Sequence, residues 1–153
     1  MEQRLRVRHV GALLVALGAL SLSGCASPTS IEDFSGLPTI PVAAEGEGAE
    51  PELEQVDVPE GETSVVYLDY GDRLALVTWG SSTCPIVGTD IEVVEDASSG
   101  NSVRIETNEI PADAVCTSDF VPHTTIFGTP ENTTTTKPLS VDVNGEEIVV
   151  PVK

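Results

Sequence analysis

Basic residues are scarce in this sequence. Only 7 Lys and Arg stand against 25 Asp and Glu, which gives the 153 residues a formal net charge of -18. A surface of this charge repels the phosphates of nucleic acids and the headgroups of anionic lipids. We therefore expect no nucleic-acid binding, and we expect the folded part of the chain to stand off from a membrane surface.

Histidine and methionine are scarce as well, and only His123 lies outside the first 24 residues. A blue-copper site needs two histidines, a thiolate and usually a methionine, so a single histidine excludes it. A serine hydrolase needs a base beside its nucleophile, and neither Ser81 nor Ser82 is followed by the second glycine of a Gly-x-Ser-x-Gly elbow. Paired carboxylates for glycoside hydrolysis remain open, but a domain of about 90 residues leaves little room for a sugar cleft. We expect no enzymatic activity and no cofactor.

Long apolar runs are absent too. The longest, residues 10–22, is shorter than the roughly 20 residues that a membrane-spanning helix needs. It follows Arg4, Arg6 and Arg8, so that a basic segment precedes a short apolar one. This order is typical of an export signal peptide, which we place at residues 1–24.

The motif Leu22-Ser23-Gly24-Cys25 follows directly, and it resembles the lipobox of bacterial lipoproteins. The resemblance implies that a diacylglycerol is attached to the Cys25 sulfur, that the signal peptide is cut before this residue, and that the lipid anchors the protein to the outer face of the cell membrane. Two acyl chains give stable attachment, whereas one anchors only marginally. An ordinary secretory signal is the alternative, since Gly24-Cys25-Ala26 also satisfies the small-x-small rule for cleavage.

Cysteine is limited to three residues, an odd number for an exported protein. Lipidation of Cys25 would leave Cys84 and Cys116, which we expect to form a disulfide in an oxidising compartment. Closing a loop of about 33 residues would stabilise the fold by on the order of 3 kcal/mol. The alternative is a reactive cysteine with His123 as its base, but no third orienting group accompanies either cysteine.

Acidic residues and prolines dominate the segment after Cys25. Ten acids and five prolines fall between residues 28 and 62, where there is no base. Such a composition cannot bury enough apolar surface to offset the entropy of ordering. We expect residues 25–60 to form a disordered acidic tether of roughly 33 Å root-mean-square length. An acidic tail that recruits a basic partner is the alternative.

Short β-like runs separated by turn residues begin after residue 61 and predict a domain over residues 61–153. Asn144-Gly145 predicts a two-residue type I′ hairpin. No segment carries a helical apolar period, so we expect an all-β fold, a small antiparallel β-sandwich of about seven strands with one disulfide. The expected strands cover residues 64–69, 73–79, 90–95, 101–107, 123–127, 139–143 and 146–152.

One modest core is expected in a sandwich of this size. An immunoglobulin-like architecture is an analogy only, because Trp79 precedes both Cys84 and Cys116 instead of lying between them. The expected core residues are Val65, Leu74, Leu76, Trp79, Ile91, Val93, Val103, Ile105, Ile126 and Val149.

A second resemblance rests on residues 78–85 (TWGSSTCP) with Cys116, Asp119 and residues 122–125 (PHTT). This pattern is similar to that of uncharacterised small lipoproteins of actinobacteria. The resemblance implies a cell-surface setting and carries no activity.

Two further features leave alternatives open. Residues 133–136 form a threonine-rich connector that we interpret as a plain loop, with O-glycosylation as the alternative. Several oxygen-bearing side chains lie at expected turns. We interpret them as solvated turn residues and not as calcium ligands, because their spacing in the sequence is not that of an EF-hand. These residues are Asp69, Asp72, Asp142, Asn144, Glu146 and Glu147.

Two functional classes fit these observations. The favoured one is a membrane-anchored, non-catalytic binding or accessory module of the cell envelope, whose partner is an envelope protein, a peptide or a glycan. The alternative is an extracytoplasmic lipoprotein that binds a small ligand or metal ion for a transporter. A solute receptor generally needs a large cleft, and one small domain argues against it.

Overall fold

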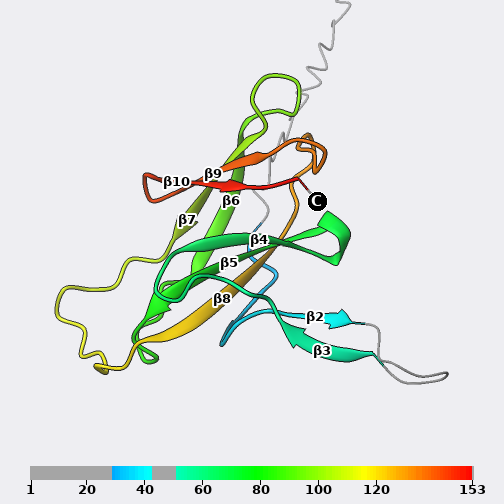
Figure 1. Ribbon diagram of the computed structural model, residues 1–153. Helices are drawn as coiled ribbons and strands as arrows, with labels where there is room; N and C mark the ends of the chain where they lie inside the picture. Colours follow the sequence, from blue (N-terminus) through cyan, green and yellow to red (C-terminus); the bar gives the residue numbers. More distant parts are fainter. Residues whose placement is uncertain (1–28, 43–50, 153) are drawn as a thin grey trace, which may run out of the picture.

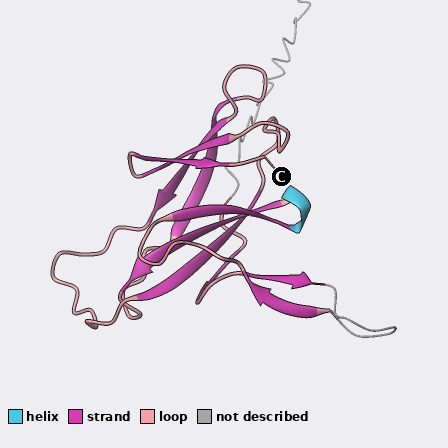
Figure 2. Ribbon diagram, viewed as in Figure 1, coloured by secondary structure: helices cyan, strands magenta, loops and turns pink. Residues whose placement is uncertain are grey.

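Two four-stranded β-sheets face each other in the computed structural model, which describes residues 29–42 and 51–152 (Figures 1 and 2). The N-terminal sheet has the order β1 (Glu32–Ser35), β8 (Val121–Gly128), β5 (Arg73–Gly80) and β4 (Ser64–Leu68). The C-terminal sheet has the order β10 (Glu146–Val150), β9 (Leu139–Val143), β7 (Ser102–Thr107) and β6 (Gly88–Glu95). A separate hairpin pairs β2 (Thr39–Val42) with β3 (Glu52–Gln55).

The expected all-β fold with one disulfide is confirmed. Strands β4 to β10 match the seven expected strands, with ends that differ by at most two residues. Asn144 and Gly145 both have positive φ, 52° and 86°, as the type I′ turn between β9 and β10 requires. One pairing differs from a purely antiparallel sandwich, because β7 and β9 are parallel. The chain crosses to the other sheet as β8 between them, and this crossover permits the parallel pairing.

Helix is almost absent from the described residues. Asp69–Gly71 forms a short helical turn, η1, between β4 and β5. No helix in the described ranges is long and apolar enough to cross a membrane. The predicted signal peptide and Cys25 lie outside the described residues.

The main core fills the space between the two sheets, and strand alternation determines its members. Leu74, Leu76 and Phe127 point inward from the N-terminal sheet and are fully buried. Seven of the ten expected core residues are buried. Ile126 lies on the outer face of the N-terminal sheet, and the other six lie in this main core, namely Val65, Leu74, Leu76, Ile91, Val103 and Ile105.

The expectation is wrong for the other three. Trp79 is half-buried because it lies next to inward-facing Thr78 and so points to the opposite face of β5. Val149 is 62% exposed, since its neighbours Ile148 and Val150 are the ones that face the core. Val93 is 37% exposed and lies at a register shift near the end of β6.

The outer face of the N-terminal sheet is also covered. Ala75 and Ile126 lie on it, and Ile40 and Val56 of the β2–β3 hairpin region pack against them. Residues 74–77 of β5 are therefore buried on both faces, which explains their continuous apolar sequence.

This packing corrects the expected disordered tether. The four residues of β1 pair antiparallel with β8, and the Ile31 N–H donates to the Ile126 carbonyl at 2.8 Å. The described residues between 29 and 60 thus carry three strands, and a disordered linker over 25–60 is wrong for them. The reason is tertiary: β8 offers an open edge to β1, and the apolar outer face of the sheet needs a cover. Residues 25–28 and 43–50 lie outside the described ranges.

Candidate functional site

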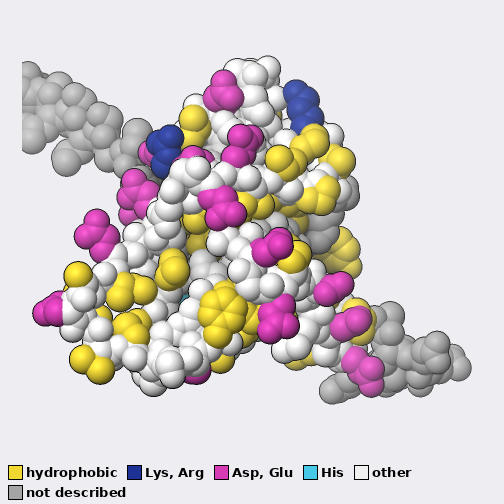
Figure 3. All heavy atoms as spheres, turned by 60° about the vertical axis from the view of Figure 1, so that its left-hand side comes forward, with side chains coloured by type: hydrophobic (Ala, Val, Ile, Leu, Met, Phe, Trp, Pro, Cys, Tyr) yellow, Lys and Arg dark blue, Asp and Glu magenta, His cyan; other side chains and the backbone are white. Residues whose placement is uncertain are grey.

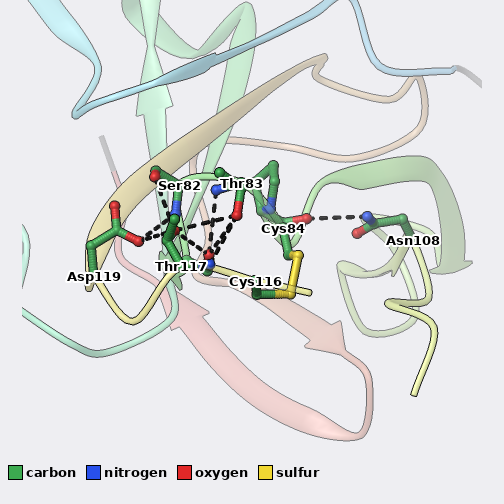
Figure 4. Close-up of a disulfide and its surroundings, with 9 residues drawn as sticks. Ser82, Thr83, Cys84, Asn108, Cys116, Thr117 and Asp119 are labelled. Carbon is green, nitrogen blue, oxygen red and sulfur yellow. Dashed lines mark hydrogen bonds between the residues drawn. A yellow bond between two sulfur atoms is a disulfide. The ribbon is translucent and has the colours of Figure 1, made fainter. Parts of the chain in front are cut away.

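Two loops at one end of the sandwich form the candidate site. The β5–β6 loop, residues 81–87, and the β7–β8 loop, residues 108–120, lie at the opposite end from the β6–β7 turn (Figure 1). The expected disulfide joins them: Cys84 and Cys116 are bonded, with their Cα atoms 5.6 Å apart (Figure 4). We call these two segments the stapled loops.

Hydrogen bonds from the β5–β6 loop fix the second loop beside the disulfide (Figure 4). The Thr117 N–H donates to Thr83 Oγ1 at 3.0 Å, and the hydroxyls of Ser81 and Thr117 are 2.8 Å apart. Asp119 Oδ1 accepts the Ser82 N–H at 3.1 Å and also the Thr117 hydroxyl. Side-chain hydrogen bonds from Ser82 and then Thr117 are the main causes that lower the pKa of Asp119 to about 2, so this carboxylate is ionised at neutral pH.

Asn108 ties the same two loops together at their base. Its Oδ1 accepts the Val87 N–H at 2.7 Å, and its Nδ2 donates to the Pro85 carbonyl at 3.1 Å. The Asn108 N–H in turn donates to the Val87 carbonyl at 2.9 Å. A covalent link and two groups of hydrogen bonds therefore hold the stapled loops in one arrangement, although residues 108–120 are all exposed.

Large apolar side chains are exposed on these loops. Val115 is 96% exposed, Phe120 is 60% exposed and Ile110 is 40% exposed. Figure 3 shows hydrophobic side chains gathered at the lower left of the face it presents. Val115 has almost its whole side chain in water, whereas Ile110 and Phe120 are partly covered by their neighbours.

Phe120 has a firm support. Its ring stacks on Trp79 with a centroid separation of 5.8 Å and an interplanar angle of 26°. A Cβ built on Gly61 would be in van der Waals contact with the same ring, at 3.5 Å. The Trp79 indole nitrogen is buried and has no hydrogen-bond acceptor among the described residues. The aromatic pair therefore holds the base of the β7–β8 loop in place.

A shallow hollow of about 310 Å³ lies between the stapled loops. Its lining is mixed, with polar groups of Thr83, Asn108 and Glu109 beside the apolar surface, and it opens to solvent beside the disulfide. The lining residues that contribute apolar surface are Cys84, Pro85, Ile110, Pro111 and Ala114.

The residues that the sequence offered for catalysis have other partners in the structure. Ser81 and Ser82 hydrogen-bond within the stapled loops. His123 lies on β8, and its Nε2 is 3.0 Å from Asp33 Oδ1 of β1. Both Cys84 and Cys116 are consumed by the disulfide, so the alternative of a reactive cysteine paired with His123 does not describe this oxidised form.

The acids proposed for calcium also have other partners. Asp69 pairs with Arg73, and Asp142 Oδ1 lies 3.5 Å from Arg104 Nε. Glu147 accepts the Ser140 hydroxyl at 2.7 Å. Within the described ranges, no group of three or more His, Cys, Asp or Glu side chains is arranged to hold a metal ion.

Comparisons of the chain with protein-family models, with curated proteins and with solved structures gave no match. Sequence reasoning identified the disulfide and the polar residues beside it, but it missed Val115, Phe120 and Asn108. Their signal is weak, because an apolar residue in a loop acquires meaning only when the structure shows it exposed.

Proposed function

We propose that this chain is an extracytoplasmic lipoprotein, anchored to the outer face of the cell membrane through Cys25, and that its β domain is a non-catalytic binding or accessory module of the cell envelope. The lipobox-like motif supports the anchor. The disulfide supports an oxidising compartment, since such bonds persist outside the cytosol.

The observation that carries the binding role is the exposure of Val115 and Phe120 on loops that a disulfide and hydrogen bonds hold in place. Ordering a loop before it meets a partner lowers the entropic cost of binding. Binding surfaces on β-sandwiches are commonly built from loops at one end of the scaffold. An apolar side chain kept in water on an ordered loop is therefore best explained by a partner that covers it.

The anchor is tested by cell fractionation. We expect the native protein in the detergent-extractable membrane fraction and Cys25→Ala in the soluble extracytoplasmic fraction. Ser27→Ala is the control and remains with the membrane. An unlipidated Cys25→Ala protein that stays in the membrane fraction would show that the anchor lies elsewhere.

The binding role is tested by purification of the lipidated protein from solubilised membranes. We expect stoichiometric recovery of one other envelope component with the native protein, and its loss with Val115→Ser. Val149→Ser is the matched control, because Val149 is a 62% exposed valine on β10, outside the stapled loops. Equal recovery with both variants would contradict the assignment of the surface.

A further inference from the structure

Charge distinguishes the stapled loops from a neutral apolar surface. The β7–β8 loop carries Glu109, Asp113 and Asp119, while residues 81–87 and 108–120 contain no Lys, Arg or His. All three carboxylates are on exposed residues around the apolar ones. The loops thus combine exposed apolar side chains with a one-signed charge.

The domain does not neutralise these carboxylates itself. Among the described residues the ion pairs involve Arg73, Arg104 and His123, and their acidic partners all lie outside the stapled loops. Lys137 donates to the Ala97 carbonyl near the β6–β7 turn. The negative potential at the loops is therefore available to a partner.

The exposed apolar side chains and the negative charge of the stapled loops together favour one kind of binding partner over the others. A second copy of the chain would bring the same carboxylates to the contact, and like charges placed opposite each other at an interface are unfavourable. Anionic lipid is repelled for the same reason. A positively charged polypeptide is attracted, and an apolar side chain on it can enter the hollow between Pro85, Ile110 and Ala114.

We propose that the stapled loops bind a basic segment of another protein and that an apolar side chain of this segment fills the hollow beside the disulfide. This inference rests on the proposed binding function and names the chemistry of its partner. The hollow supplies the apolar contact, and the surrounding carboxylates supply long-range attraction and orientation.

The first test uses dye-labelled peptides and the full lipidated chain in a neutral detergent. The probes are KKLKK, KKGKK and EELEE, each acetylated and amidated, with binding followed by fluorescence anisotropy. We expect KKLKK to bind about tenfold more tightly than KKGKK, and EELEE not to bind. We also expect binding of KKLKK to weaken as salt rises from 50 to 500 mM, since the charges are exposed.

Variants of the domain then test where the peptides bind. Ala114→Trp fills the hollow without removing apolar surface, and we expect it to abolish the preference for KKLKK over KKGKK. Glu109→Gln combined with Asp113→Asn should weaken both basic peptides and reduce the salt dependence. The matched control is Glu146→Gln with Glu147→Gln on β10, which removes the same charge elsewhere and should leave the affinity for both basic peptides unchanged.

Failure of KKLKK to bind would overturn the inference, and so would three other outcomes. They are equal affinity for KKLKK and KKGKK, equal loss in the β10 control, and binding of the unlipidated Cys25→Ala chain to phosphatidylglycerol vesicles through the stapled loops. The anchor is tested separately by fractionation. If KKLKK fails to bind while a partner is still recovered from membranes, the inference about its chemistry falls and the proposed function stands.

Discussion

Removal of the disulfide gives the most quantitative test of how the stapled loops contribute to stability. Cys84 and Cys116 are separated by 32 positions. Worked out for this separation, the chain-entropy model gives a stabilisation of about 3.7 kcal/mol at 25 °C, close to 4 kcal/mol and slightly above the order-of-magnitude figure from the sequence, because the cross-link restricts the unfolded chain. Cys84 is half-buried and Cys116 is exposed, so replacing both with serine creates no core cavity. We expect the double serine variant to lose most of this 4 kcal/mol.

Urea denaturation of the full chain measures the loss. With a slope of about 2 kcal/mol per molar urea for a domain of this size, the midpoint should fall by about 2 M. Reduction of the native protein should give the same midpoint as the variant, while the reductant should leave the variant unchanged. Native-state spectra should change only around residues 81–87 and 108–120.

Either of two results would refute this reasoning. A loss below about 1 kcal/mol would mean that closing the loop does not restrict the unfolded chain as the model assumes. A loss above about 6 kcal/mol, with spectral changes in the core, would mean that the disulfide supports packing between the sheets. In that case the two sheets would depend on the stapled loops for their packing.

Three further predictions concern other parts of the domain. Asn101→Ala should lower the free energy of unfolding, measured by urea denaturation, by about 3 kcal/mol. The Asn101 side chain is 1% exposed, donates to carbonyls of the β8–β9 loop at 3.0 Å and accepts an N–H from this loop at 2.9 Å, and a loss below 1 kcal/mol would contradict this role. The pKa of Asp119 is lowered to about 2 from an unfolded value near 4, so the stability that its carboxylate contributes is complete above pH 4 and is lost as pH falls through about 2. Asp119→Asn should therefore make amide exchange in the stapled loops less sensitive to acid. If the pH dependence of exchange is the same in the variant, Asp119 does not stabilise these loops. Gly88→Ala should lower stability by about 1–3 kcal/mol because a Cβ there would lie 2.6 Å from the Phe127 ring, whereas the control Gly80→Ala meets nothing within 4 Å and should be neutral in thermal melts.

Strand alternation made most of the domain predictable. In β7 and β9 apolar and polar residues alternate, and the predicted inward residues Val103 and Ile105 are buried. The predicted core residues were wrong where the sequence does not determine which residues of a strand face inward. Residues 148–150 of β10 are all apolar, so the pattern alone does not choose between Val149 and its two neighbours. At Trp79 large size suggested burial, but its position next to Thr78 decides the direction in which the ring points.

β1 could not be predicted because its partner lies far away in the sequence. The segment Glu32–Ser35 is short, polar and exposed, and it becomes a strand only by pairing with β8, some 90 residues later. The candidate site shows the same limit. Cysteine counting predicted the covalent link between Cys84 and Cys116, whereas the exposure of Val115 depends on how the two loops fold together.

The pairing of β1 with β8 has a mechanical consequence. If lipid is attached to Cys25, the chain from that residue to Thr29 spans at most about 14 Å, so the domain is held close to the bilayer and not at the end of a long spacer. Tension from the anchor then enters at the Glu32 end of β1 and is shared by its hydrogen bonds to β8. The stapled loops adjoin the opposite end of β8, at Val121, so the strand that resists the pull on one side carries the proposed contact surface on the other.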